Sequence, residues 1–246
     1  MIDISTVGTV QMLTLSSGPV NAQDVELLEE LASTVRELAR SDAGALVVTG
    51  AGRAFSAGVD LNRVVQGGTG YTDRLVPALS AAFEAMFSYP GPTVAAINGA
   101  AIAGGCVLAC ACDRRLISPE AQIGAAEVRV GVPFPVAALE IMRYACGMHA
   151  DEVLLGGRNH RGADAVARGL AHRVVADEII EAAVAEASDL GSVPADAYRQ
   201  TKTQLHAPTM ARIHEARGVD DEVRRTWGTD ETLGRIAAYV ERLRRR

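Results

Sequence analysis

The chain has 246 residues, of which 48% are hydrophobic and 22% are charged, and its net charge at pH 7 is −6. A chain of this length and composition has enough apolar residues for one sizeable core and is not intrinsically disordered. The negative net charge argues against a general nucleic-acid-binding protein, because neutralising phosphates requires clustered lysines and arginines.

In the first half of the chain, hydrophobic periodicity predicts strands and helices in alternation. The predicted strands span about 7–15, 45–49, 93–97 and 115–118, and the predicted helices span about 24–40 and 73–88, with another beginning over 104–111. The short apolar runs at 45–49 and 93–97 are typical of buried parallel strands. We expect a loop containing Gly50, Gly52 and Gly58 between them, and residues 66–70 are expected to be mobile.

From Pro135 onward the pattern indicates helices. Pro135 opens a helix that Gly147 closes, which matches the preference for proline at the start of a helix and glycine after its end. Further helices are predicted over 149–155, 162–168, 177–189, 195–206, 209–225 and 230–245. Strands and helices in alternation, followed by helices alone, predict an α/β core over residues 1–191 and a C-terminal helical region over residues 192–246.

The four cysteines do not have the spacing of metal ligands. Three of them form the pattern C-x3-C-x-C inside an apolar, alanine-rich stretch, and no histidine is near them. We interpret Cys106, Cys110, Cys112 and Cys146 as small core residues of a protein that works in a reducing compartment, the cytoplasm. The first residues also lack the basic and apolar regions of a secretory signal.

One uncharged stretch, between Glu84 and Asp113, is long enough to cross a bilayer. Prolines and glycines interrupt it, and it has neither flanking basic residues nor an aromatic belt. A buried strand, turn and helix explain the stretch better, so no membrane span is expected.

Two segments rich in small residues follow the predicted buried strands. They are Ala54 to Leu61 and Ile97 to Cys106. Ligands usually bind at the carboxyl ends of parallel strands, and small residues allow a close approach to the backbone. One backbone N–H from each segment could together bind an oxyanion. The alternative is that both segments are tight turns whose small residues serve packing alone.

A third segment, Gln122 to Pro133, contains one carboxylate, Glu127, among small and apolar residues. Burial would raise the pKa of this carboxyl group and make it a general acid or base near neutral pH. The alternative is a surface glutamate paired with Arg129.

Together these segments resemble the crotonase family, the enoyl-CoA hydratases and isomerases, over nearly the whole chain. The matching motifs are Pro19-Val20-Asn21-Ala22, Val48-Thr49-Gly50, Phe55-Ser56-Ala57-Gly58-Val59-Asp60, Ala95-Ala96-Ile97-Asn98-Gly99, Ala103-Gly104-Gly105-Cys106, Cys112-Asp113, Ile123-Gly124, Glu127, Gly131, Gly169-Leu170 and a final helix with Tyr239 and Arg242. The resemblance implies an α/β fold, the crotonase (ClpP-like) spiral of ββα units, with a C-terminal all-helical trimerisation region. It also implies a homotrimer or a hexamer made of two trimers, an acyl-CoA thioester as substrate, and no metal or redox cofactor, because CoA arrives with the substrate.

The resemblance also implies roles for individual residues. The N–H groups of Val59 and Gly104 would form the oxyanion hole, and Ala57 and Leu61 would contact CoA. Glu127 would be the catalytic carboxylate.

The chain departs from the family's hydratases at Val107. Those enzymes have a second glutamate three residues after the oxyanion-hole glycine, where this chain has Val107. Hydration is suited to two carboxylates, whereas one suffices to move a double bond. The Δ3,Δ2-enoyl-CoA isomerase branch shares the single glutamate and the aliphatic residue, so the chain is expected to be an isomerase. A hydratase that uses Glu127 alone or with another carboxylate, and a non-catalytic acyl-CoA-binding paralogue, are the alternatives.

The acyl pocket is expected within residues 62–90. Leu75, Leu79, Phe83 and Met86 are the candidate lining residues, although their helical spacing fits core positions equally well.

Overall fold

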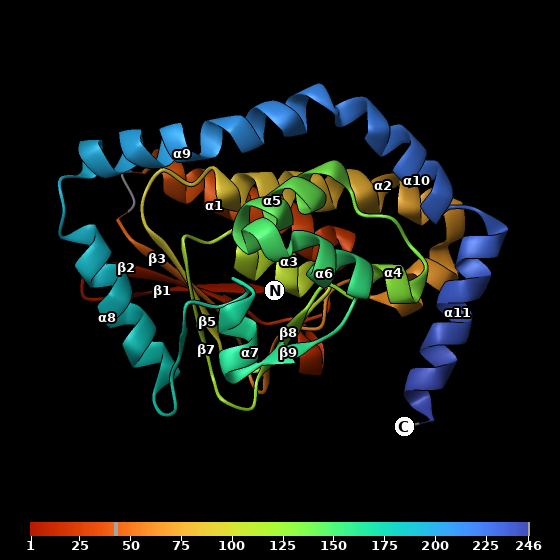
Figure 1. Ribbon diagram of the computed structural model, residues 1–246, viewed down its shortest axis with the longest axis horizontal. Helices are drawn as coiled ribbons and strands as arrows, with labels where there is room; N and C mark the ends of the chain where they lie inside the picture. The colour runs from red at the N-terminus through yellow and green to blue at the C-terminus, as the bar shows by residue number, and fades with distance from the viewer. Residues whose placement is uncertain (42–43, 246) are drawn as a thin grey trace.

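The computed structural model describes residues 1–41 and 44–245 as two sheets with helices packed around them (Figure 1). Arg246, the last residue of the predicted helical region, lies outside the described residues. The larger sheet has the order β1 (Ile2–Val7), β2 (Val10–Leu15), β3 (Leu46–Gly50), β5 (Thr93–Ile97), β7 (Arg114–Ile117) and β10 (Arg173–Val174). The smaller sheet has the order β4 (Ala54–Ser56), β6 (Ala100–Ile102), β8 (Gln122–Gly124) and β9 (His160–Arg161).

The two sheets are connected by a repeated ββα unit. Each of three consecutive units gives one strand to the larger sheet and the next strand to the smaller one: β3 and β4, β5 and β6, and β7 and β8. Within each sheet these strands are parallel to their neighbours, and only the outer pairs β1–β2 and β8–β9 are antiparallel. This is the predicted α/β spiral of ββα units.

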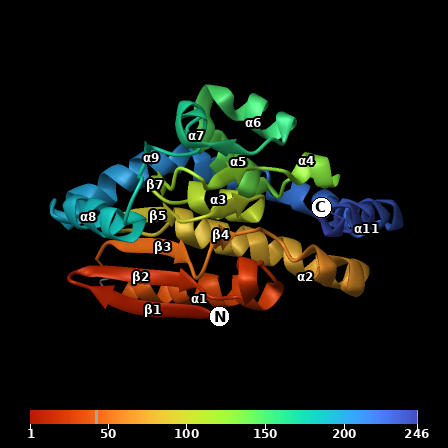
Figure 2. The ribbon, with the colours of Figure 1, turned by 90° about the horizontal axis from the view of Figure 1, so that it is seen from below.

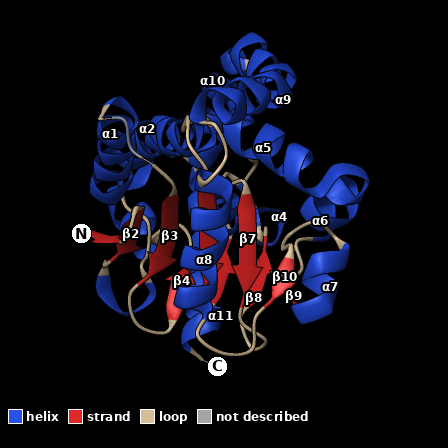
Figure 3. Ribbon diagram, turned by 90° about the vertical axis from the view of Figure 1, so that its left-hand side faces the viewer, coloured by secondary structure: helices blue, strands red, loops and turns tan. Residues whose placement is uncertain are grey.

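Helices cover the sheets and fill the second half of the chain. They are α1 (Val25–Arg40), α2 (Leu61–Phe87), α3 (Gly104–Cys110), α4 (Glu127–Val130), α5 (Val136–Cys146), α6 (Ala150–Gly156), α7 (Gly162–Ala167), α8 (Ile179–Gly191), α9 (Ala195–Glu215), α10 (Asp220–Trp227) and α11 (Asp230–Arg244), with short 3-10 turns at Gly18–Val20, Gly147–His149 and Arg217–Val219. α8 lies across one face of the larger sheet, and α1, α2 and α5 lie above the sheet in the same view (Figure 3). The predicted division at residues 191 and 192 falls between α8 and α9 and stays a prediction.

The two faces of the larger sheet have separate apolar cores. Val10, Val47 and Val94 point to the face where α8 contributes Ala183 and Ala187. The residues that alternate with them along the strands point into the main core, which they share with α1, α2, α3 and α5. All four cysteines are buried as free thiols, in agreement with the prediction. In the described part of the chain, no helix combines the length and apolar character needed to cross a membrane.

The stretch 7–15, predicted to form strands, contains all of one strand and only the end of another. The predicted range 7–15 covers β2, but β1 begins at Ile2 and the chain turns at Gly8 and Thr9. The side chains of β1 are largely exposed, so no apolar alternation marks this edge strand in the sequence.

The prediction of a mobile segment at 66–70 is wrong, because these residues are part of α2. α2 bends where Gly68 has φ 55° and ψ −148°, and it continues on both sides of the bend. Tertiary contacts hold this glycine-rich part in place: Thr69 donates a hydrogen bond from its hydroxyl to the carbonyl oxygen of Gly228 at 2.7 Å.

The predicted break between helices at 207–208 is also wrong, because α9 continues through Pro208 to Glu215. Proline removes one helical hydrogen bond. Packing of the surrounding turns compensates: His206 stacks on Phe87 with 3.8 Å between ring centroids, and Thr209 and Ile213 are buried. The chain leaves the helix only at Ala216.

Candidate active site

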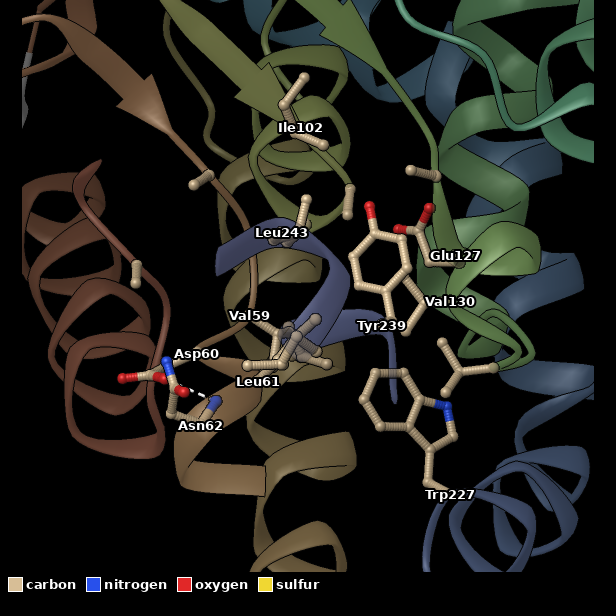
Figure 4. Close-up of a pocket in the computed structure, with 18 of the residues that line it drawn as sticks. Val59, Asp60, Leu61, Asn62, Ile102, Glu127, Val130, Trp227, Tyr239 and Leu243 are labelled. Carbon is tan, nitrogen blue, oxygen red and sulfur yellow. Dashed lines mark hydrogen bonds between the residues drawn. The ribbon is translucent and has the colours of Figure 1, made fainter. Parts of the chain in front are cut away.

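The five residues predicted to form the site line one cavity of about 530 Å³ (Figure 4). Ala57, Val59 and Leu61 come from the segment after β4, Gly104 follows β6, and Glu127 follows β8. β4, β6 and β8 are neighbouring strands of the smaller sheet, and the first two are parallel to the third. Their carboxyl ends therefore meet at one edge, which brings together residues that are 70 positions apart in the chain.

The segment after β4 is held by buried polar side chains. Asn21, with φ 50°, donates hydrogen bonds from its side-chain amide to the carbonyl oxygens of Ala51 and Ala54 at 3.0 and 2.8 Å. Ser56 donates from its hydroxyl to the carbonyl oxygen of Asn21, and the N–H of Gly58 donates to the Ser56 hydroxyl. This network fixes the backbone immediately before Val59.

The backbone of Gln23 sets the direction of the Val59 N–H. The N–H of Gln23 donates to the carbonyl oxygen of Gly58, and the carbonyl oxygen of Gln23 accepts from Asp60. In a parallel pairing these two bonds use the groups on either side of Val59, so the N–H of Val59 points away from Gln23. In the loops and caps of the described residues, no backbone acceptor receives the N–H of Val59 or of Gly104.

Glycines allow the segments after β4 and β6 to touch. A Cβ atom added at Gly58 would lie 2.5 Å from the carbonyl oxygen of Ile102 and 3.0 Å from the nitrogen of Gly104. A Cβ atom at Gly105 would lie 2.2 Å from the carbonyl oxygen of Ser56. Real side chains do not fit at such distances, so glycine is required for close approach. Close packing, the alternative explanation of these small residues, therefore accounts for the glycines. The same packing places the N–H groups of Val59 and Gly104 beside one cavity.

Glu127 is the first residue of α4 and is only 7% exposed. Its Oε2 atom is buried and has no hydrogen-bond partner in the described part of the protein. Burial raises the pKa of Glu127 to about 8, and a bond to its own backbone N–H offsets this only in part. The alternative pairing with Arg129 is absent, because that guanidinium is directed to the carbonyl oxygen of Gly156 at 2.9 Å.

Among the described residues, the cavity has one other carboxylate in its wall, that of Asp60. Asp60 caps α2 and accepts hydrogen bonds from the N–H groups of Asn62 and Arg63 at 3.0 and 3.2 Å. Figure 4 shows it on the opposite side of the cavity from Glu127. Val107 is fully buried in α3 and is not one of the lining residues. Glu127 is therefore the carboxylate placed to move protons within this cavity.

Apolar side chains line the rest of the cavity. Leu79 and Phe83 of α2 line it as the sequence suggested, whereas Leu75 and Met86 are buried in the core instead. Trp227 is also a lining residue, and its indole N–H donates to the carbonyl oxygen of Pro133 at 2.9 Å. A cavity of this kind suits an apolar chain attached to one polar reacting group.

α11 forms a cavity wall that sequence reasoning did not identify. Tyr239, Val240, Leu243 and Arg244 line the cavity, and their spacing of one, three and one residues places them on one helical face. The same spacing is present in the sequence, where it indicates a helix with an apolar face without showing what that face covers.

The site therefore combines two unbound N–H groups, an apolar cavity and one buried carboxylate of raised pKa. This set can stabilise an oxyanion formed when a proton is removed beside a carbonyl group. In the described residues, no cluster of histidine, cysteine and acidic side chains has the arrangement of a metal site.

Comparison with known proteins shows similarity along the whole chain. A model of the enoyl-CoA hydratase/isomerase family matches residues 5–245. A Thermus thermophilus protein whose name places it with the enoyl-CoA hydratases is 37% identical over 167 residues, 66% of each chain. A Mycobacterium avium protein named a probable enoyl-CoA hydratase is 33% identical over 201 residues, covering 80% of this chain and 77% of the relative. The crystal structure of human mitochondrial Δ3-Δ2-enoyl-CoA isomerase has the same fold, with a TM-score of 0.93 at 24% identity over 99% of this chain and 98% of that one.

Proposed function

The chain belongs to the enoyl-CoA hydratase/isomerase family, and on that premise we propose that it is an enoyl-CoA isomerase that converts a 3-enoyl-CoA to the trans-2-enoyl-CoA. The observation that carries the proposal is the single carboxylate, Glu127, in the reacting part of the cavity. Adding water to a double bond requires one group to activate the water and another to protonate carbon. Moving a double bond needs only one group that accepts and returns a proton.

The proposed mechanism has two proton transfers. Ionised Glu127 removes a proton from C2, and the electron pair of that C–H bond forms a dienolate. The N–H groups of Val59 and Gly104 bind the dienolate oxygen, and removing one such donor typically lowers the rate by about 10²–10³. Protonated Glu127 then gives its proton to C4, while the electrons re-form the thioester carbonyl and a double bond between C2 and C3.

Ala57 and Leu61 are proposed to contact CoA, and Leu79, Phe83 and Trp227 the acyl chain. The reaction moves a proton without net oxidation, so we propose that it needs no metal or redox cofactor beyond the CoA that the substrate carries. The four buried free thiols support the further proposal that the enzyme works in the reducing cytoplasm.

The test of this function is the conversion of 3-hexenoyl-CoA to trans-2-hexenoyl-CoA. We expect turnover by the wild-type protein and a loss of at least about 10³-fold in Glu127→Gln, which keeps the size of the side chain but cannot shuttle the proton. Glu29→Gln, an exposed substitution on α1, is the matched control and should leave turnover unchanged. Full activity of Glu127→Gln would rule the mechanism out. Binding of acyl-CoA with no turnover would instead indicate a non-catalytic paralogue.

Hydration is the second candidate, because the similar proteins from Thermus and Mycobacterium avium carry hydratase names. A hydratase would have to work with Glu127 as its one available carboxylate. The two reactions are separated by comparing kcat/KM for hydration of crotonyl-CoA with that for isomerisation of 3-hexenoyl-CoA. A higher value for hydration would favour the hydratase.

We also propose that the protein assembles as a homotrimer, or as a hexamer of two trimers. The support is the surface: Met148, Leu155 and Leu205 are the most exposed large apolar side chains of the described residues, at 92%, 75% and 60%. Such side chains are typical of surfaces that a partner covers. The helical region 192–246, which contains Leu205, is proposed to take part in the interface.

A further inference from the structure

The hydroxyl of Tyr239 points into the cavity toward the part that holds the Glu127 carboxylate (Figure 4). Tyr239 belongs to α11, whereas Glu127 is the first residue of α4, so the two residues come from helices that are far apart in the chain. In this structure no hydrogen bond joins them, and Glu127 Oε2 has no donor in the described part of the protein. A buried carboxylate without a donor is costly when it is ionised, and Glu127 must be ionised to act as a base.

The contact between α11 and α4 fixes where Tyr239 lies. Thr232 and Ile236 are buried, and the side chain of Arg235 packs over Gly131, the residue that ends α4. A Cβ atom at Gly131 would lie 3.1 Å from the Cδ atom of Arg235. Tyr239 is one helical turn beyond Arg235, on the same face. Packing at the end of α4 therefore directs the phenol ring along α4 toward its beginning, where Glu127 lies.

Two of the other donors in the cavity wall are already engaged. The indole N–H of Trp227 donates to Pro133, and the guanidinium of Arg244 donates to the side-chain oxygen of Asn62 at 2.8 Å. Among the hydrogen bonds of the described residues, the hydroxyl of Tyr239 has none. The side-chain amide of Asn62 also donates no hydrogen bond among those of the described residues, but Asn62 lies beside Asp60, across the cavity from Glu127 (Figure 4). Tyr239 is therefore the neutral donor on the Glu127 side of the cavity that is free to bind a carboxylate.

We propose that Tyr239 is a positioning residue for Glu127: when an acyl-CoA fills the cavity, the tyrosine hydroxyl donates a hydrogen bond to the glutamate carboxylate. The inference rests on the proposed function. Hydrogen bonds in active sites are often long without substrate and shorten in the complex. The bond orients the carboxylate toward the substrate and favours its ionised form, because it is made to the charged oxygen.

The remaining titratable groups around Glu127 do not supply such a donor. The thiol of Cys106 on α3 is buried, and burial first of all, with a smaller contribution from the charge of Glu127, raises its pKa. On α4 and α11, Arg129 is directed to Gly156 and Arg235 is paired with Glu231. Arg242 lies over the Tyr239 ring with 5.7 Å to its centroid, and on α6 Glu152 is paired with Arg168.

The test compares Tyr239→Phe, which removes only the hydroxyl, with the wild-type protein. Tyr144→Phe on α5, outside the cavity, is the matched control for loss of a tyrosine hydroxyl. With 3-hexenoyl-CoA, we expect Tyr239→Phe to keep KM within about twofold and to lower kcat at pH 7 about tenfold. The acidic limb of its kcat profile should move to higher pH by about one unit, since losing a donor to the carboxylate raises its pKa. A uniform fall of kcat at every pH, or no change, would overturn the proposal.

A second measurement is independent of turnover. The carboxyl signal of Glu127, assigned by its loss in Glu127→Gln, is titrated by ¹³C NMR with hexanoyl-CoA bound. The midpoint should be higher in Tyr239→Phe than in the wild type and in Tyr144→Phe. Equal midpoints contradict the role of Tyr239 even if the enzyme isomerises as proposed. A higher midpoint in Tyr239→Phe, in a protein without any isomerase activity, would support the hydrogen bond between Tyr239 and Glu127 and reject the proposed reaction. Failure to bind hexanoyl-CoA would reject both.

Discussion

At the residue scale, Glu127 destabilises the folded protein for the same reason that it suits proton transfer. Its carboxyl group is buried without a donor to Oε2 in the described residues, and this raises its pKa from 4.5 to about 8. In the unfolded chain the group ionises near its ordinary value. Between pH 4.5 and 8 the folded protein therefore holds a proton that the unfolded chain has lost, and stability falls as the pH rises through this window.

Glu127→Gln should accordingly gain stability with rising pH relative to the wild type. The gain should be small at pH 4.5 and grow to at most about 4 to 5 kcal/mol above pH 8, because each unit of pKa shift is worth about 1.4 kcal/mol. Thermal unfolding of the two proteins at pH 5 and pH 8.5 measures this. A difference in melting temperature that is the same at both pH values would show that the carboxyl group is not buried as described.

Gly104 is an example of a site residue that could be predicted from the sequence alone. Its position after a predicted strand and its small size suggested a backbone donor, and the structure places it on the cavity wall. The neighbouring Tyr239 and Trp227 gave no such signal, since their helical spacing is that of ordinary core residues. Their place on the cavity depends on how α10 and α11 fold back over α2, and no local pattern encodes that contact.

At the scale of elements, the long strands and helices were predictable and the short strands were not. The apolar runs of β3 and β5 are five residues long, and the helical pattern of α1 spans four turns. By contrast, β4 and β6 have three residues each, too few to show a period, and Ala100 and Ala101 are not typical of strands. The site residues nevertheless follow these short strands. The sequence therefore predicted the segments that form the site, but not the small sheet that brings them together.

The end of α10 is expected to set the length of acyl chain that the enzyme accepts. Trp227 is 2% exposed, is anchored to Pro133, and closes the apolar part of the cavity (Figure 4). Trp227→Leu should open this end and shift preference toward longer 3-enoyl-CoA substrates, by about fourfold in relative kcat/KM for each newly buried methylene. The measurement compares six-, eight- and ten-carbon substrates. A parallel loss for all three lengths would mean that Trp227 only stabilises the fold.

At the scale of the whole molecule, the two most exposed large apolar side chains of the described residues, Met148 and Leu155, lie far from the N-terminal strands. Figure 2 shows α6 and β1 at opposite ends of the molecule. Met148 and Leu155 lie on the 3-10 turn Gly147–His149 and on α6, which follows it directly, so they belong to one exposed part of the surface. A surface of this kind fits the proposed contact between copies of the chain.

Replacing both residues by glutamate should weaken that assembly, because charges would be buried in the interface. We expect light scattering after size-exclusion chromatography to give a trimer or hexamer for the wild type and smaller species for Met148→Glu/Leu155→Glu. Val7→Glu, at an exposed apolar position on β1, is the control and should keep the wild-type mass. A monomeric wild-type protein, or an unchanged mass of the double variant, would contradict the proposal.

The repeated ββα unit also bears on how such a protein can change in evolution. The unit ending in β4 supplies Val59, the next supplies Gly104 and the third supplies Glu127, each just beyond the corresponding short strand. In the proposed mechanism the first two positions act through backbone N–H groups, which tolerate a change of side chain wherever the close packing allows it. Only the third depends on the identity of a side chain. New reactions can therefore arise through substitutions at a few positions of the cavity, while the backbone groups proposed to bind the carbonyl oxygen stay the same.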